Sequence, residues 1–167
     1  TLGTWSAITQ GANTSFGDTG IAQFAQHGDL LAVFAGRPAM LKDISSGAIN
    51  RLGGPAPSSA PTWNLSAGAL TGLTQGFLTF YDSTSGWESS PSPVTSLTTL
   101  AAQQISWASL PTTVAKEGVT HKRLYRTLLG ANGEAPYYRV TEVTLATTTY
   151  ADTSSDATLE ANVPYPD

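Results

Sequence analysis

Side chains that could carry out chemistry are few in this chain of 167 residues. The first candidates are the carboxylates Asp82 and Glu88, which stand on either side of one predicted turn. A glycosidase needs two carboxyl groups about 5 to 10 Å apart, and the two arms of a hairpin could bring them that close. Aspartate at the start of a turn more commonly caps its own backbone. We therefore interpret Asp82 as a turn cap and Glu88 as an exposed strand residue.

Metal ligands are equally sparse. Asp152 and Asp156 could supply oxygens to Ca²⁺, but Ca²⁺ takes about 6 to 8 oxygen ligands and the segment offers no third and fourth acidic residue. His27 and His121 are far apart in the sequence and have no partner at ligand spacing. Cysteine is absent, which excludes disulfides and thiolate ligands. We expect no metal and no cofactor.

Nucleophilic catalysis has no sequence support either. Serines are abundant, but no Gly-x-Ser-x-Gly turn is present, and the segment from Gly68 to Gly72 lacks a suitable nucleophile. The sequence therefore predicts a protein that is not an enzyme and has no catalytic residues.

Aromatic side chains are the remaining candidates for a contact site. Trp87 and Tyr137 could act as stacking platforms for sugars, or they could pack within the fold or at a subunit contact, and we favour packing. Trp5 and Phe16, which lie among turn-forming residues near the start of the chain, are further candidates for contact with a partner or a glycan.

Charge and hydropathy limit the partners. Charged residues make up only 12% of the chain and the formal net charge is −4, which argues against a nucleic-acid footprint. No apolar run approaches the length of about 20 residues that a membrane span needs. Exposed faces covered by hydroxyl and small side chains suit packing against protein neighbours.

Prolines and glycines divide the chain. Residues 53–61 (GGPAPSSAP) cannot form a central strand or a helix, and we interpret them as a linker. Before it, residues 1–52 contain two short apolar strands, 29–36 and 38–43, which predict a small β-meander or an extended arm that docks on a partner. Residues 62–167 form the second predicted domain.

This second domain is predicted to be all-β. About seven short strands are separated by turn signals every 8 to 12 residues or so, the pattern of a two-sheet antiparallel β-sandwich. In the clearest strand, Ile105 and Trp107 share one face, which we assign to the core. Leu78 and Phe80 are the expected inward pair of an earlier strand, and 120–128 and 135–143 are expected to form a hairpin.

The order of motifs after residue 53 resembles the fibronectin type III-like, immunoglobulin-like module of structural proteins from tailed bacteriophages. The motifs are Gly54-Pro55-Ala56-Pro57, Thr79-Phe80-Tyr81-Asp82, Gly86 followed by Glu88-Ser89, Pro91-Ser92-Pro93, Ile105 to Pro111, Lys122 to Thr127, Tyr137 to Val140, and Thr148 to Asp152 followed by Asp156 and Leu159. One departure is Gly76, because the family usually has an aromatic residue before the position of Leu78.

The resemblance implies a non-enzymatic virion component in a tail, a head-to-tail region or a capsid surface, where it could decorate the shell. Its partners would be other virion structural proteins, and it would form a homo-oligomer within a symmetric assembly as a rigid spacer and contact module. Two alternatives stay open: a carbohydrate-binding or host-adhesion module, and an accessory domain of a secreted enzyme.

Overall fold

The computed structural model describes residues 23–27, 30–34, 40–43, 49–51, 54–116, 118–130 and 136–165. The chain forms two compact units: the first comprises residues 1–54 with 115–117, and the second comprises residues 55–114 with 118–167. Among the described residues, no helix is long and apolar enough to cross a membrane.

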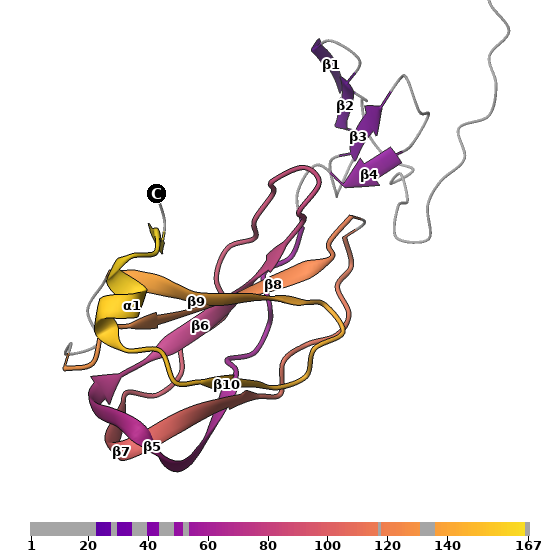
Figure 1. Ribbon diagram of the computed structural model, residues 1–167. Coiled ribbons are helices and arrows are strands. Elements are labelled where there is room, and N and C mark those ends of the chain that lie inside the picture. Colours follow the sequence, from indigo (N-terminus) through magenta and orange to yellow (C-terminus); the bar gives the residue numbers. More distant parts are fainter. Residues whose placement is uncertain are drawn as a thin grey trace, which may run out of the picture. The chain divides into compact units, whose positions relative to one another are not determined.

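The first unit contains an antiparallel meander. Its strands are β1 (Gln23–His27), β2 (Leu30–Phe34), β3 (Met40–Asp43) and β4 (Ile49–Arg51), and each pairs with the next along the chain (Figure 1). The apolar sequence of β2, LLAVF, is the strand that the sequence predicts most clearly in this region. Strands β2 and β3 fall within the predicted strands 29–36 and 38–43.

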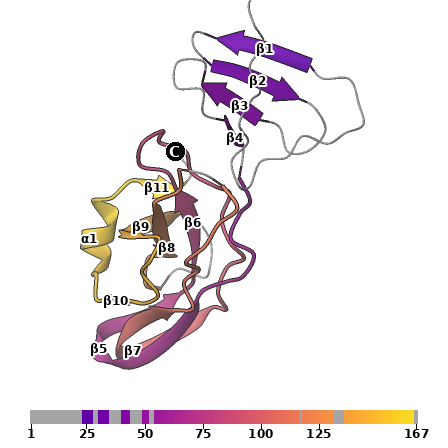
Figure 2. The ribbon, with the colours of Figure 1, turned by 90° about the vertical axis from the view of Figure 1, so that its right-hand side faces the viewer.

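The second unit contains two antiparallel sheets. One sheet is formed by β5 (Thr62–Thr74), β7 (Thr98–Ala108) and β10 (Tyr150–Asp152), in the order β10-β7-β5. The other is formed by β6 (Gly76–Tyr81), β8 (His121–Thr127), β9 (Tyr137–Thr144) and β11 (Pro164–Tyr165), in the order β11-β9-β8-β6. The hairpin of β8 and β9 is the one that the sequence predicts, and Figure 2 shows the ribbon of β5 and β7 at the outside of the unit.

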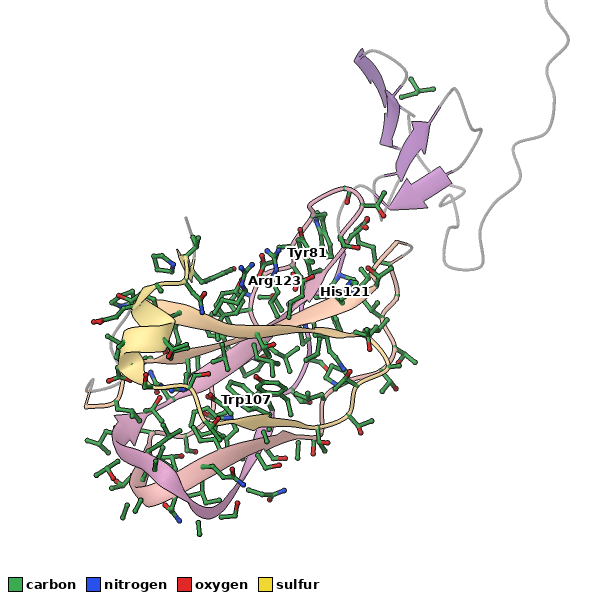
Figure 3. All side chains as sticks on the ribbon, viewed as in Figure 1. Tyr81, Trp107, His121 and Arg123 are labelled. Carbon is green, nitrogen blue, oxygen red and sulfur yellow. The ribbon has the colours of Figure 1, made fainter. Side chains whose placement is uncertain are left out.

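The core of the second unit takes side chains from both sheets. Trp107 and Ile105 on β7 are fully buried, as predicted, and Trp107 points toward the other sheet (Figure 3). The rings of Trp63 and Trp107 meet edge to face with centroids 5.1 Å apart. The buried cluster is Leu70, Leu78, Leu100, Ile105, Trp107, Leu110 and Leu124. Because an aromatic ring buries a large apolar area, the two tryptophans dominate this contact.

Strand β6 is buried on both faces. The expected inward pair, Leu78 and Phe80, is buried, but so are Phe77 and Thr79 on the opposite face. Phe77 stacks on Tyr125 of the neighbouring strand β8, with ring centroids 5.2 Å apart. A second layer of aromatic rings therefore covers the face of β6 that points away from the main core.

Gly76 occupies a crowded position. A Cβ atom at Gly76 would lie 2.5 Å from the Tyr125 carbonyl oxygen, 2.6 Å from the Trp107 ring and 2.8 Å from the Trp63 ring. Real Cβ atoms do not approach other atoms so closely, because repulsion rises steeply below van der Waals contact. The two tryptophan rings fill the space in which a side chain at this position would lie.

A short helix, α1 (Asp156–Glu160), was not expected from the sequence. Its N-cap is Ser155, whose Oγ accepts a hydrogen bond from the Thr158 backbone N–H at 3.3 Å. Leu159 is fully buried and fixes the helix to the domain. Five residues are too few for helical periodicity to show in the sequence.

The segment after β6 turns back and runs alongside that strand, at the outer edge of the sheet. A strand was expected at 87–90, but the structure has only an isolated bridge between Tyr81 and Glu88. We call Ser89, Ser92 and Thr95 the hydroxyl ladder. Their backbone N–H groups donate to the carbonyls of Phe80, Leu78 and Gly76, and their hydroxyl oxygens accept from the N–H groups of the same three residues, at distances of 2.8 to 3.2 Å.

Candidate functional site

Glu88 is the centre of a hydrogen-bonded group of side chains. Its Oε1 accepts hydrogen bonds from the Thr79 hydroxyl at 2.6 Å and the Tyr125 hydroxyl at 2.7 Å. Its Oε2 accepts from Nη1 of Arg123 at 2.7 Å. The interpretation of Glu88 as an exposed strand residue is therefore wrong: both carboxylate oxygens are engaged with neighbouring strands.

Arg123 connects this group to β9. Its Nε donates to Glu142 at 2.9 Å, and its guanidinium carbon lies 3.3 Å from the centroid of the Tyr81 ring (Figure 3). Burial lowers the pKa of Arg123, but the hydrogen bonds to Glu142 and Glu88 outweigh it, and the pKa lies above its ordinary value. The guanidinium is a permanent cation between two carboxylates.

Tyr125 supplies a hydroxyl group that remains a hydrogen-bond donor. Burial and the hydrogen bond to Glu88 raise the pKa of Tyr125 well above its usual range, so the hydroxyl keeps its proton. Its ring belongs to a cluster with Phe77, Tyr137 and Tyr165, whose adjacent centroids lie 4.8 to 5.2 Å apart. The Tyr125 hydroxyl is therefore a fixed hydrogen-bond donor that orients Glu88.

Asp82 faces its own turn. Its carboxylate accepts hydrogen bonds from the Thr84 backbone N–H at 2.9 Å and the Ser85 hydroxyl at 2.7 Å. This is the turn cap that the sequence predicts, because aspartate satisfies the donors of the residues that follow it. Asp82 and Glu88 thus have separate sets of hydrogen-bond partners on their hairpin.

A second group of charges includes the two aspartates considered as Ca²⁺ ligands. Arg126 and Asp152 are fully buried, and Nε of Arg126 donates to Oδ2 of Asp152 at 2.8 Å. Asp156 lies 3.6 Å from Nη1 of Arg126 and also accepts the Leu129 backbone N–H at 3.0 Å. The guanidinium is the cation between these carboxylates, and the part of the chain that the structure describes has no group of three or more metal-binding side chains.

Among the described residues, the aromatic side chains that the sequence suggests as contacts with a partner or a glycan do not lie together. Tyr137 is half-buried, packs on Phe77 and accepts a hydrogen bond from Nε2 of Gln75 at 2.6 Å. Trp87 is half-buried beside the hairpin turn. Trp5 and Phe16 lie outside the described residues. The structure does not bring Trp87 and Tyr137 into one contact.

A cavity of about 480 Å³ opens beside the Glu88 group. Its lining residues are Glu88, Ser89, Arg123, Tyr125, Arg139, Val163, Pro164 and Tyr165. Arg139 differs from Arg123 because its guanidinium has no hydrogen bond or ion pair among the described residues, whereas its backbone carbonyl accepts from Asn162 at 2.7 Å. The cavity therefore combines an unengaged cation with the ring of Tyr165, and its size is typical of small-ligand sites.

Lys122 is a buried cation on the other face of β8. Its Nζ donates to the carbonyl oxygens of Pro111 at 2.7 Å and Leu145 at 3.1 Å, and also to that of Thr147. These three acceptors use all the donors of an ammonium group. Burial lowers the pKa of Lys122 to about 8.

We expect the free energy of unfolding to rise between pH 8 and pH 10. The lysine pKa is 10.5 in an unfolded chain, so over this range the unfolded state binds more protons than the folded state. At about 1.4 kcal/mol per pH unit the upper bound is about 2.7 kcal/mol, and the three carbonyl acceptors reduce the expected rise to roughly 1 to 2 kcal/mol. Above pH 10 the trend reverses, because unfolded tyrosine ionises there while Tyr125 resists ionisation.

Urea denaturation at each pH measures this rise, and the matched variant Lys122→Met should lack it while keeping the fall above pH 10. A rise of the same size in Lys122→Met would show that another group is responsible.

The sequence alone does not indicate that Lys122, Arg123 and Arg126 are structural residues. The segment Lys122 to Thr127 contributes to the resemblance as a motif, without a role for its charged side chains. The signal was the alternation along β8, which places Lys122 and Arg126 with Leu124 on one face and Arg123 with Tyr125 on the other.

Comparison of this chain with family models, with curated proteins and with solved structures gives no match.

Proposed function

We propose that this chain is a non-enzymatic structural protein of a bacteriophage virion, seated in the tail, the head-to-tail region or the capsid surface. Its second unit is an immunoglobulin-like β-sandwich of the fibronectin type III kind and acts as a rigid spacer and subunit-contact module. Two antiparallel sheets that share one buried cluster support this assignment.

The observation that carries the proposal is that charged residues from different motifs of the resemblance pair with one another. Glu88 and Arg123 come from two motifs that support the resemblance, and they bond to each other. Arg126 and Asp152 come from a second pair of motifs and form the buried ion pair. The Glu88–Arg123 pair ties β8 to the segment beside β6 within one sheet, and the Arg126–Asp152 pair ties β8 to β10 of the other sheet. Such ties are what a rigid scaffold needs, and this supports a structural role for the motif set.

The test is composition of the virus particle. We expect mass spectrometry of gradient-purified particles made from the source genome to detect peptides of this chain, at a ratio to the major capsid protein that is constant across the particle peak. Antibody raised against the second unit should label one position on the particle in electron micrographs. Peptides found only in soluble lysate, with none in the particles, would refute the proposal.

A second candidate function is supported by the cavity. An unengaged guanidinium at Arg139 and the Tyr165 ring suit a saccharide that carries a carboxylate, because arginine binds carboxylates in two parallel hydrogen bonds and sugar rings stack on aromatic faces. Arg123 and Glu88 also line the cavity, are already paired with each other, and would present fixed polar groups.

We expect N-acetylneuraminic acid or glucuronic acid to shift the backbone amide resonances of Val163 and Tyr165 in NMR titrations, and glucose to leave them unchanged. Arg139→Gln should weaken this binding about ten-fold or more, because a hydrogen bond to a charged group is lost. Glu160→Gln, on the exposed face of α1, is the control. Equal binding of glucose and the acidic sugars would contradict this candidate.

A further inference from the structure

Strand β5 is an edge strand, because among the described residues it pairs only with β7. Along its first part, from Thr62 to Ala67, the register with β7 is regular, and every residue in this part except Trp63 is exposed. Beyond Ala67 the register shifts, and the ladder is broken by bulges. The part 62–67 is therefore the regularly paired, exposed edge of the sheet, and we call it the β5 edge.

Charges that normally protect such an edge are absent. Strands β5 (TWNLSAGALTGLT) and β7 (TTLAAQQISWA) contain no charged residue and no proline. Natural proteins commonly place lysine or proline on an exposed edge, because free N–H and C=O groups otherwise pair with another chain. The formal net charge of the chain is −4, so the neutral β5–β7 ribbon is a face on which two copies can meet without like-charge repulsion.

The side chains of the β5 edge alternate in a way that a second strand would continue. Leu65 is one of the exposed large apolar residues, with 37% of its surface accessible, and it lies on the same face as Trp63. Asn64 and Ser66 point to the other face, where Nε2 of Gln104 donates to the Ser66 hydroxyl at 2.9 Å. An added strand of the same sequence would cover Leu65 with an apolar residue and would face the polar side chains with polar ones.

We propose that a second copy of this chain pairs with the β5 edge in antiparallel fashion across a two-fold axis at Leu65. Leu65 then faces Leu65 of the second copy, Trp63 faces Ala67, and Asn64 faces Ser66. This register matches apolar with apolar and polar with polar side chains, as a self-complementary interface requires. This inference rests on the proposed function, because it identifies a second copy of the chain as the partner in the proposed subunit contact.

Oxidative cross-linking of Leu65→Cys tests the pairing directly. The chain has no cysteine, so the variant carries a single thiol. Directly opposed residues of an antiparallel pair have Cα atoms about 4.5 to 5.5 Å apart, which a disulfide can bridge. The control is Leu97→Cys, a residue that is 46% exposed and outside the β5 edge.

We expect Leu65→Cys to form disulfide dimers at least about ten-fold faster than Leu97→Cys at equal protein concentration, because pairing raises the effective concentration of the thiols. Cross-linking of both variants at the same rate would overturn the proposal.

Sedimentation equilibrium of the full chain gives the independent measurement. We expect a reversible dimer that Leu65→Lys abolishes, since two ammonium groups would then face each other, and that Leu97→Lys leaves intact. A chain that remains monomeric at the highest soluble concentration would also overturn the proposal. Neither result depends on finding the chain in virus particles, so failure of this proposal is distinguishable from failure of the virion assignment.

Discussion

Replacement of Asp152 by asparagine is expected to lower the free energy of unfolding by about 3 to 5 kcal/mol. Asp152 and Arg126 are both fully buried, and the carboxylate is the nearest counter-charge of the guanidinium. The variant keeps the shape of the side chain but leaves a buried cation without its close partner, which costs far more than an exposed ion pair contributes. Urea denaturation followed by tryptophan fluorescence measures the loss.

Asp156→Asn is the matched control, because Asp156 lies 3.6 Å from the same guanidinium and is partly exposed. We expect it to cost about 1 kcal/mol or less, as for other solvent-exposed ion pairs. Replacing both members of the buried pair, Arg126→Met with Asp152→Leu, should recover part of the stability, because no unpaired charge remains. An Asp152→Asn variant no less stable than Asp156→Asn would show that the buried pair does not stabilise the domain.

Truncation of Trp107 to alanine is the second large effect, with an expected cost of about 3 to 5 kcal/mol. The side chain is fully buried and is the largest in the core, so its removal leaves a cavity between the two sheets. Its Nε1 has no hydrogen-bond partner among the described residues, a small penalty that the truncation relieves, but the lost packing is much larger.

Trp107→Phe separates the two contributions. It removes the unpaired N–H and keeps an aromatic ring against Trp63, but it leaves a smaller cavity than alanine does, so we expect a cost between zero and that of Trp107→Ala. The melting temperature and the urea midpoint should both follow the order wild type, Trp107→Phe, Trp107→Ala. A folded Trp107→Ala chain with an unchanged melting temperature would contradict the assignment of this residue to the core.

Alternation was sufficient to predict much of the second unit. Ile105 and Trp107 stand two residues apart among polar neighbours, and that pattern alone assigns them to the core. The same rule could not predict that β5 runs without a break from Thr62 to Thr74. A Cβ atom at Gly68 would lie 2.4 Å from the Gln104 backbone nitrogen, so this glycine permits a close approach within the sheet, whereas in the sequence it resembles a strand end.

The hydrogen-bonded group around Glu88 could not be predicted from the sequence, because its members come together only through the pairing of separate strands. Thr79, Arg123 and Tyr125 come from β6 and β8, and they meet Glu88 only because β6 and β8 pair and the segment after β6 follows that strand. Periodicity indicates that Arg123 and Tyr125 share a face, but it carries no information on which segment lies opposite.

The buried charged residues are the second feature that the sequence could not predict. Lys122 and Arg126 lie on the apolar face of β8, where a hydropathy pattern predicts solvent-exposed ends. They remain there because carbonyl oxygens and Asp152 satisfy their donors, and those partners follow from tertiary structure.

The hydroxyl ladder restricts which edge of the second unit can pair with a strand of another chain. Because Ser89, Ser92 and Thr95 already occupy the outer hydrogen bonds of β6, that sheet cannot accept a further strand there. The other sheet ends at β10, which has only three residues, on the side opposite the β5 edge. Among the sheet edges that the structure describes in the second unit, β5 is the longest strand, and a two-fold contact at β5 occupies this edge in both copies.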